Sequence, residues 1–112
     1  MPLNATIEDR AGAQFAALAD DGRRRVLDLI SASPVSVSDL ATELGVSVPA
    51  ALKQVRALEA ASLVRTRKDG RTRWCELDPR AGADAEAWLA QRRAKWSRRL
   101  DRFEQHLREN KK

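Results

Sequence analysis

Two clusters of basic side chains are the residues best suited to chemistry in this sequence, and that chemistry is the binding of phosphate. Segment 48–60 reads VPAALKQVRALEA, and helical spacing places Lys53 and Arg56 on one face of it. The second cluster surrounds Asp69-Gly70 and consists of Arg65, Arg67, Lys68, Arg71 and Arg73. Ammonium and guanidinium groups replace the counterions of nucleic-acid phosphates, so both clusters are candidate phosphate contacts. A solvated surface is the alternative, since most runs of charge face water.

Residues for catalysis or metal binding are scarce. The chain has one histidine, His106, one cysteine, Cys75, and no tyrosine. No nucleophile triad, acid–base pair or phosphate-binding glycine loop is present, so we expect no enzymatic activity and no cofactor. A stable transition-metal site needs three or four ligands, and two soft ligands predict none.

Cys75 alternates with Leu77 on one face of a predicted strand, which indicates a small buried hydrophobic side chain. A redox-sensing thiol is the alternative, if Arg71 or Arg73 lowers its pKa. His106 lies near the end of the last predicted helix, where we expect it to face solvent.

Composition limits the class of protein. The chain has 112 residues, enough for one domain, and its formal net charge of +5 favours nucleic acid or an anionic surface as partner. No apolar run approaches the roughly 20 residues that span a bilayer, and the first residues lack the order of a secretion signal. With a single cysteine, these features predict a cytoplasmic protein that does not enter the membrane.

Apolar periodicity and capping residues predict five helices. After a loose arm to about Glu8, their ranges are 9–18, a segment after Asp20 or Asp21 that ends by Ser33 and Pro34, 36–44, 48–60 and 83–110. The segment PVSV that follows the second helix is a candidate edge strand.

The third and fourth helices form a compact pair. Ser36 and Asp39 resemble a capping box, Gly45 is the expected left-handed stop, and Ser47 caps the next helix with Pro49 in its first turn. Two short helices at such a corner are typical of a helix-turn-helix.

After segment 48–60 the spacing of apolar residues changes from 3.6, the period of a helix, to 2, the period of a strand. Two alternating runs flank Asp69-Gly70, which predicts a β-hairpin from Leu63 to Leu77 with the basic cluster at its tip.

The last predicted helix carries more apolar surface than one small domain covers. It is roughly 40 Å long at 1.5 Å per residue. We expect it to pair with its copy, together with the first helix, in a two-fold dimer. The predicted interface residues are Phe15, Leu18, Trp88, Leu89, Trp96, Leu100, Phe103 and Leu107. The alternative is that this stripe completes a monomer core. Arg98, Arg99 and Arg102 are expected to form surface ion pairs with Asp101 and Glu104 or dimer-edge contacts.

Helix, corner, helix and basic hairpin follow one another in the order of a winged helix-turn-helix. In the segments FAALADDGRRRVLDLI, SVSDLATELGVSVPAALKQVRALEAASLVRTRKDGRTRWCELDP and WLAQRRAKWSRRLDRFEQHL, the chain resembles the arsenic-repressor-type (ArsR) winged-helix transcriptional regulators. The resemblance runs from about Phe15 to Leu107. The tail is most similar to the non-metal autorepressor subgroup, and the resemblance implies a dimeric repressor.

Two features depart from the family pattern. Members commonly carry Ser and His where this chain has Leu52 and Gln54. Gln54 is a plausible reader of adenine, whereas Leu52 is expected to pack against the core. Metal-sensing members use clustered cysteines in the third helix, and SVSDLATEL contains none, so we expect no metal sensing.

We therefore predict a mostly α fold with a small β-hairpin, a winged helix-turn-helix with a long C-terminal dimerisation helix. One domain spans 1–112, with the core in 9–82 and the dimerisation helix in 83–110. The expected function is sequence-specific binding of double-stranded DNA at an inverted repeat, through helix 48–60 and the hairpin 63–77. The expected DNA contacts are Ser47, Pro49, Ala50, Lys53, Gln54, Arg56, Lys68, Arg71 and Arg73. A winged-helix module that binds a protein partner is the alternative, and no residue pattern identifies an effector ligand.

Overall fold

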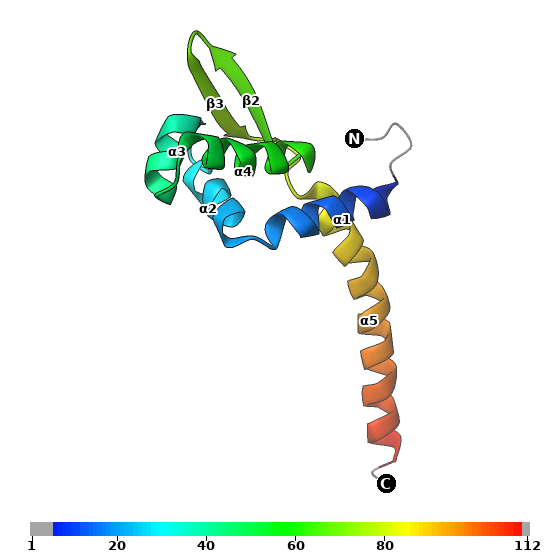
Figure 1. Ribbon diagram of the computed structural model, residues 1–112. Coiled ribbons are helices and arrows are strands. Elements are labelled where there is room, and N and C mark those ends of the chain that lie inside the picture. The colour runs from blue at the N-terminus through cyan, green and yellow to red at the C-terminus, as the bar shows by residue number, and fades with distance from the viewer. Residues whose placement is uncertain (1–5, 111–112) are drawn as a thin grey trace.

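The computed structural model describes residues 6–110 and contains five helices and three short strands (Figure 1). The elements are α1 (Ile7–Leu18), α2 (Asp21–Leu29), β1 (Val35–Ser36), α3 (Val37–Leu44), α4 (Val48–Ala60), β2 (Val64–Asp69), β3 (Thr72–Leu77) and α5 (Ala83–Glu109). The predicted fold class is confirmed: a winged helix-turn-helix core carries a long C-terminal helix.

Helix α1 begins earlier than the sequence predicted. The Thr6 hydroxyl accepts a hydrogen bond from the Asp9 backbone N–H at 3.1 Å, and the Asp9 carboxylate accepts one from the Thr6 N–H at 3.2 Å. This capping box satisfies two N–H groups at the helix start, so the helix begins at Ile7. The expectation of a loose arm as far as Glu8 is therefore wrong for residues 6–8, and the rest of that arm lies outside the described residues.

The corner between α3 and α4 forms as the local sequence predicts. Ser36 and Ser47 each accept a backbone N–H from the residue three positions later, at 3.1 and 3.2 Å, and so cap the two helices. Gly45 has a φ of 69°, the left-handed conformation that glycine adopts without strain. Gly45 therefore ends α3, and the chain turns there into α4.

The sheet has three antiparallel strands in the order β1-β3-β2. Segment β2–β3 is the predicted hairpin, hereafter the wing, with Gly70 at a φ of 62° in its turn. The predicted edge strand also forms, because Val35 pairs with Cys75. This pairing attaches the root of the wing to the start of α3.

The core lies between α2, α3, α4 and the root of the wing. Ala51, Val55 and Leu58 lie on one face of α4, and all three are completely buried. Leu52 is half-buried and packs against the same core, as expected from its type. The outward face of α4 is thereby left to polar and small residues.

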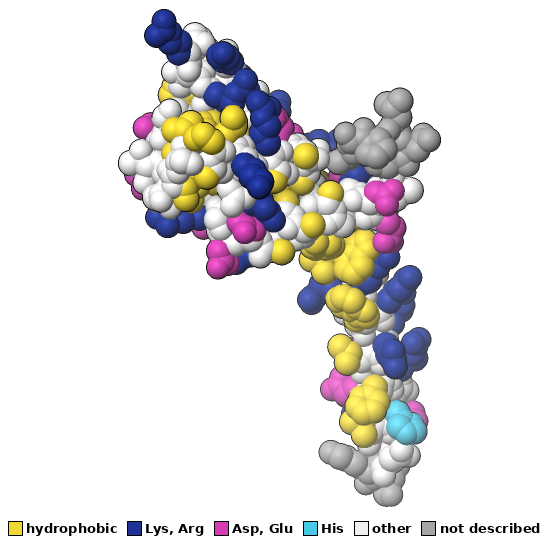
Figure 2. All heavy atoms as spheres, viewed as in Figure 1, with side chains coloured by type: hydrophobic (Ala, Val, Ile, Leu, Met, Phe, Trp, Pro, Cys, Tyr) yellow, Lys and Arg dark blue, Asp and Glu magenta, His cyan; other side chains and the backbone are white. Residues whose placement is uncertain are grey.

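Helix α5 extends away from this core (Figure 1). The molecule measures 72 Å along its longest axis, and only Ala85 of α5 is buried. Apolar side chains remain uncovered along the helix (Figure 2). Among residues 6–110, no helix is long and apolar enough to cross a membrane.

Candidate nucleic-acid interface

The outward face of α4 is formed by Pro49, Ala50, Lys53 and Arg56, all exposed. Buried residues occupy the opposite side of the helix at positions 51, 55 and 58, so this exposure follows from the helical period. Pro49 and Ala50 are small, which lets a ligand approach the helix backbone closely. Ser47 lies at the start of the same helix, where its hydroxyl is used as the cap.

A groove of about 230 Å³ joins α4 to the wing. Its lining residues are Val37, Ser38, Val48, Leu52, Lys68, Arg71 and Arg73. The lining residues from α3 and α4 are mostly apolar, whereas the cationic lining residues come from the wing. Figure 2 shows Lys and Arg side chains running from the tip of the wing onto the body of the domain. The fold therefore brings the wing cations Lys68, Arg71 and Arg73 beside the start of α4.

The basic residues of the wing differ in what their charges contact. Arg65 lies 3.8 Å from Glu76, and the Arg67 guanidinium lies 6.0 Å from the centre of the Trp74 ring. Arg73 donates to the Thr66 hydroxyl at 3.1 Å. Lys68 and Arg71 at the tip are exposed and enter no ion pair within residues 6–110, so they are the wing cations most available to an anion.

A carboxylate ties the wing to α4. Glu59 accepts the Thr66 backbone N–H at 3.2 Å and the Thr66 hydroxyl at 2.7 Å through one oxygen. Its other oxygen lies 3.7 Å from Arg56. The sequence analysis did not single out Glu59 or Thr66, because helical and strand periods do not show which side chains meet where two elements join.

Gln54 lies on the side of α4 that faces α2. Its amide nitrogen donates to Asp20 at 3.1 Å, and its carbonyl oxygen accepts from Arg23 at 3.3 Å. A Cβ at Gly22 would lie 3.1 Å from that amide nitrogen, so glycine leaves room for it. Hydrogen bonding from the Arg23 backbone N–H lowers the pKa of Asp20 and keeps the carboxylate charged. The predicted adenine reader is thus oriented by Asp20, which caps α2, and by Arg23 of α2, two contacts that the sequence did not reveal.

Cys75 is completely buried in β3, as predicted for a small hydrophobic residue. Burial, together with the charges of Glu59 and Glu76, raises the pKa of its thiol to about 12. The redox alternative required a lowered pKa, whereas burial and the neighbouring carboxylates raise it.

His106 is exposed near the end of α5, as predicted, and hydrogen-bonds Asn110 at 3.0 Å. No group of three or more metal-binding side chains is found within the described part of the chain.

The predicted dimer residues differ in how exposed they are and in what they contact within the protein. The Phe15 and Trp88 rings pack edge to face with centres 5.5 Å apart, joining α1 to α5. Leu18 is half-buried against the core. The other five remain 41–66% exposed on α5: Leu89, Trp96, Leu100, Phe103 and Leu107.

The basic residues of distal α5 do not pair as expected. Arg98, Arg99 and Arg102 enter no ion pair within residues 6–110, so that part of the prediction is wrong. Glu104 pairs with Arg108 instead, at 3.6 Å and one helical turn away. Contacts at a dimer edge stay a prediction for these arginines.

Comparisons with known proteins agree with this architecture. A helix-turn-helix domain model matches residues 18–67. The HTH-type transcriptional regulator Rv2034 of Mycobacterium tuberculosis is 39% identical over 71 residues, which make up 63% of this chain and 64% of that regulator. The match thus spans slightly less than two thirds of that regulator.

Solved structures extend the similarity to nearly the whole chain. The ArsR family transcriptional regulator RHA00566 is 35% identical, covering 83% of this chain and 96% of that chain with a TM-score of 0.75. An ArsR-like regulator from Rhodococcus sp. RHA1 is 34% identical, covering 86% and 91% with a TM-score of 0.71. Mb0332 of Mycobacterium bovis, a homodimeric winged helix-turn-helix DNA-binding domain, is 25% identical, covering 87% of each chain with a TM-score of 0.63. With this fold, this surface and these relatives, the chain belongs to the ArsR family of transcriptional regulators.

Proposed function

We propose that this protein is a homodimeric, sequence-specific DNA-binding repressor that occupies an inverted-repeat operator without sensing a metal. The observation that carries the proposal is the shared groove: the start of α4 and the exposed wing cations Lys68 and Arg71, which enter no ion pair among the described residues, line one surface. A duplex offers a major groove and a flanking phosphate backbone side by side, which such a surface matches.

In this proposal α4 is the recognition helix. The small residues Pro49 and Ala50 allow its first turns to enter the major groove, with Ser47 near the backbone and Lys53 and Arg56 on the exposed face. Gln54 uses one amide hydrogen and one carbonyl lone pair within the protein. The other hydrogen and lone pair are the combination that adenine recognition requires.

The wing supplies affinity more than selectivity. Lys68 and Arg71 are exposed at its tip, and Arg73, which pairs with Lys68 across the hairpin, is half-buried. Contacts from such side chains to phosphate release counterions, so binding would weaken steeply as salt rises. The net charge of +5 also adds affinity without selectivity, because it attracts the protein to any duplex.

The exposed apolar stripe on α5 supports a homodimer. Leu100 and Phe103 are 66% and 61% exposed, an arrangement that a second copy would cover. The homodimeric state of Mb0332 supports the same assembly here. A two-fold axis would present two recognition helices to half-sites one or more turns of DNA apart, roughly 34 Å or a multiple of it.

Fluorescence anisotropy tests the proposal directly. Purified protein is titrated into labelled duplex from its own upstream region, with a random duplex as competitor, at several salt concentrations. A specific, salt-dependent complex of one dimer per site is expected. Equal and weak binding to both duplexes would contradict the proposal and favour a protein partner for the winged helix.

A further inference from the structure

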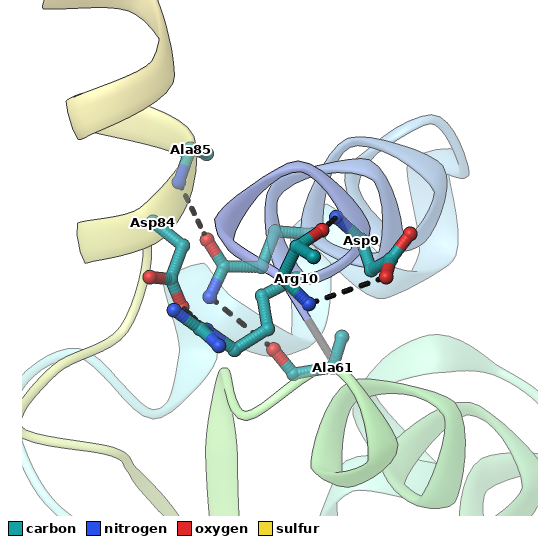
Figure 3. Close-up of polar contacts among 7 residues, drawn as sticks. Asp9, Arg10, Ala61, Asp84 and Ala85 are labelled. Carbon is teal, nitrogen blue, oxygen red and sulfur yellow. Dashed lines mark hydrogen bonds and ion pairs between the residues drawn. The ribbon is translucent and has the colours of Figure 1, made fainter. Parts of the chain in front are cut away.

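Gln14 is a buried polar side chain at the place where three elements meet. It lies on α1 and is only 1% exposed. Its amide nitrogen donates to the Ala61 carbonyl at the end of α4, at 3.4 Å, and its carbonyl oxygen accepts the Ala85 N–H at the start of α5, at 2.8 Å. Figure 3 shows both bonds, reaching Ala61 on one side and Ala85 on the other. One amide therefore joins the end of α4 to the beginning of α5.

Further polar contacts within residues 6–110 join α1 to α5. The Arg10 side chain lies 3.3 Å from Asp84, beside the Gln14 bonds (Figure 3). Towards the start of α1, Glu8 accepts from the Trp88 indole at 3.2 Å and from Arg92 at 2.6 Å. These contacts join α1 to α5, and their partners do not lie on α4.

Among the described elements, α5 packs chiefly against α1. The direction of α5 relative to α4 therefore depends on how α1 is fixed to each of them. Of the side chains with a hydrogen bond in residues 6–110, Gln14 alone bonds both the end of α4 and the start of α5. Directly after Ala61, Ser62 has a φ of 60°, so the chain turns sharply beside the carbonyl that Gln14 holds.

We propose that Gln14 is a positioning residue that sets the angle between α4 and α5 and thereby the half-site spacing that the dimer accepts. This inference rests on the proposed function, since it assigns α4 to the DNA and α5 to the dimer. Gln14 would touch neither DNA nor the partner and would act through the two helices that do.

The chemistry of the site requires an amide. One end must donate to a carbonyl and the other must accept from an N–H, and glutamine carries both groups. Leucine has a similar volume and offers neither. A glutamate carboxylate still accepts the Ala85 N–H but places negative charge against the Ala61 carbonyl, and protonation restores a donor there.

A small change in the angle between α4 and α5 would change the half-site spacing that the dimer fits. A rotation of about 10° moves a point about 20 Å from the pivot by about 3.5 Å, roughly the rise of one base pair. In a symmetric dimer both recognition helices move, so the preferred spacing responds to small rotations at this joint.

Distance measurement by electron paramagnetic resonance tests the joint without DNA. Spin labels are placed at Lys53→Cys on α4 and Arg98→Cys on α5, both exposed, in a Cys75→Ala background. Dilution with unlabelled protein restricts the signal to pairs within one protomer. Gln14→Leu is compared with the parent and with Gln105→Leu, a control at an exposed glutamine of α5.

The parent and the Gln105→Leu control are expected to show one narrow distance distribution. Gln14→Leu should shift its mean by about 3 Å or double its width, because both bonds are lost. A folded Gln14→Leu protein with the parent distribution would overturn the proposal. If Gln14→Leu does not fold, Gln14→Glu decides: the distribution should broaden at neutral pH and narrow when acid protonates the carboxyl, and an unchanged distribution at both pH values would overturn the proposal.

The second measurement uses duplexes in which the half-sites are separated by spacers differing by one base pair. The parent should show one optimum, with affinity at least about tenfold lower two base pairs away. Gln14→Leu, or Gln14→Glu at neutral pH, should move or flatten this optimum, while a base substitution within a half-site costs the same factor as in the parent. A uniform loss at every spacing would indicate a structural role and contradict the inference. A parent that does not distinguish operator from random DNA would refute the proposed function, and the spin-label distances would still decide the role of Gln14 in the joint.

Discussion

Thr66 donates both its backbone N–H and its hydroxyl to a single oxygen of Glu59, at 3.2 and 2.7 Å. The hydroxyl in turn accepts from Arg73 at 3.1 Å. The first strand of the wing is thereby attached to the last turn of α4. Under the proposed function, this attachment fixes where the cations of the wing lie relative to α4, the proposed recognition helix.

Replacing Thr66 with valine should lower stability and loosen the wing. Valine keeps the shape and removes the hydroxyl, which bonds a charged group, so the free energy of unfolding should fall by about 1.5–3 kcal/mol in urea titrations. Thr42→Val is the matched control, because the Thr42 hydroxyl bonds the Ser38 carbonyl on an exposed helix face. Its effect should stay within about 0.5 kcal/mol. Equal losses in the two variants would show that the bond to Glu59 contributes nothing specific.

Arg71→Ala should weaken binding to all DNA sequences alike. Arg71 is exposed at the tip of the wing and enters no ion pair within residues 6–110. Losing one phosphate contact should reduce the slope of log K against log salt by about 0.9. Arg65→Ala removes an arginine that pairs with Glu76, and should change the slope less. A loss at Arg71 confined to certain sequences would mean that the wing reads bases.

The double substitution Lys53→Ala with Gln54→Ala should remove sequence preference and leave a dimer. Both side chains belong to α4, while the apolar stripe proposed for the dimer lies on α5. Each good contact to a base edge is worth about 1–3 kcal/mol of discrimination, so the ratio of operator to random affinity should fall at least tenfold. Sedimentation equilibrium checks the dimer. Unchanged discrimination would refute the assignment of α4 as the recognition helix.

Cys75 should resist alkylation and aromatic disulfide reagents at pH 8 while the protein is folded. Burial raises the pKa of its thiol to about 12 from an ordinary 9.0, so almost no thiolate forms and no reagent reaches it. The rate of modification should follow unfolding. Rapid labelling in the folded state would restore the redox alternative.

The same shift predicts how stability depends on alkaline pH. Since the folded pKa is raised, the contribution of the thiol is fully present below the unfolded pKa near 9 and is lost as pH rises towards 12. Between these values the free energy of unfolding should fall more steeply in the parent than in Cys75→Ala. Parallel curves for the two proteins would show that this thiol does not titrate differently in the folded state.

Features that depend on neighbouring residues could be predicted from the sequence. Ser36, Gly45 and Ser47 define the corner because caps and left-handed stops involve positions within one turn of helix. The hairpin follows from alternation around Asp69-Gly70, and the uncovered stripe on α5 from its helical period. The outward position of Lys53 and the burial of Cys75 follow in the same way, because a period divides an element into inner and outer faces.

Only the tertiary structure decided which side chains meet across elements. Gln54 bonds Asp20, 34 positions earlier, and Gln14 bonds Ala61 and Ala85, 47 and 71 positions later. Periodicity predicts that a residue faces inward and does not identify its partner, since the partner depends on how the helices cross. A polar residue such as Gln14 also contradicts the apolar pattern that marks a core, and it is stable there only because both ends of its amide are bonded.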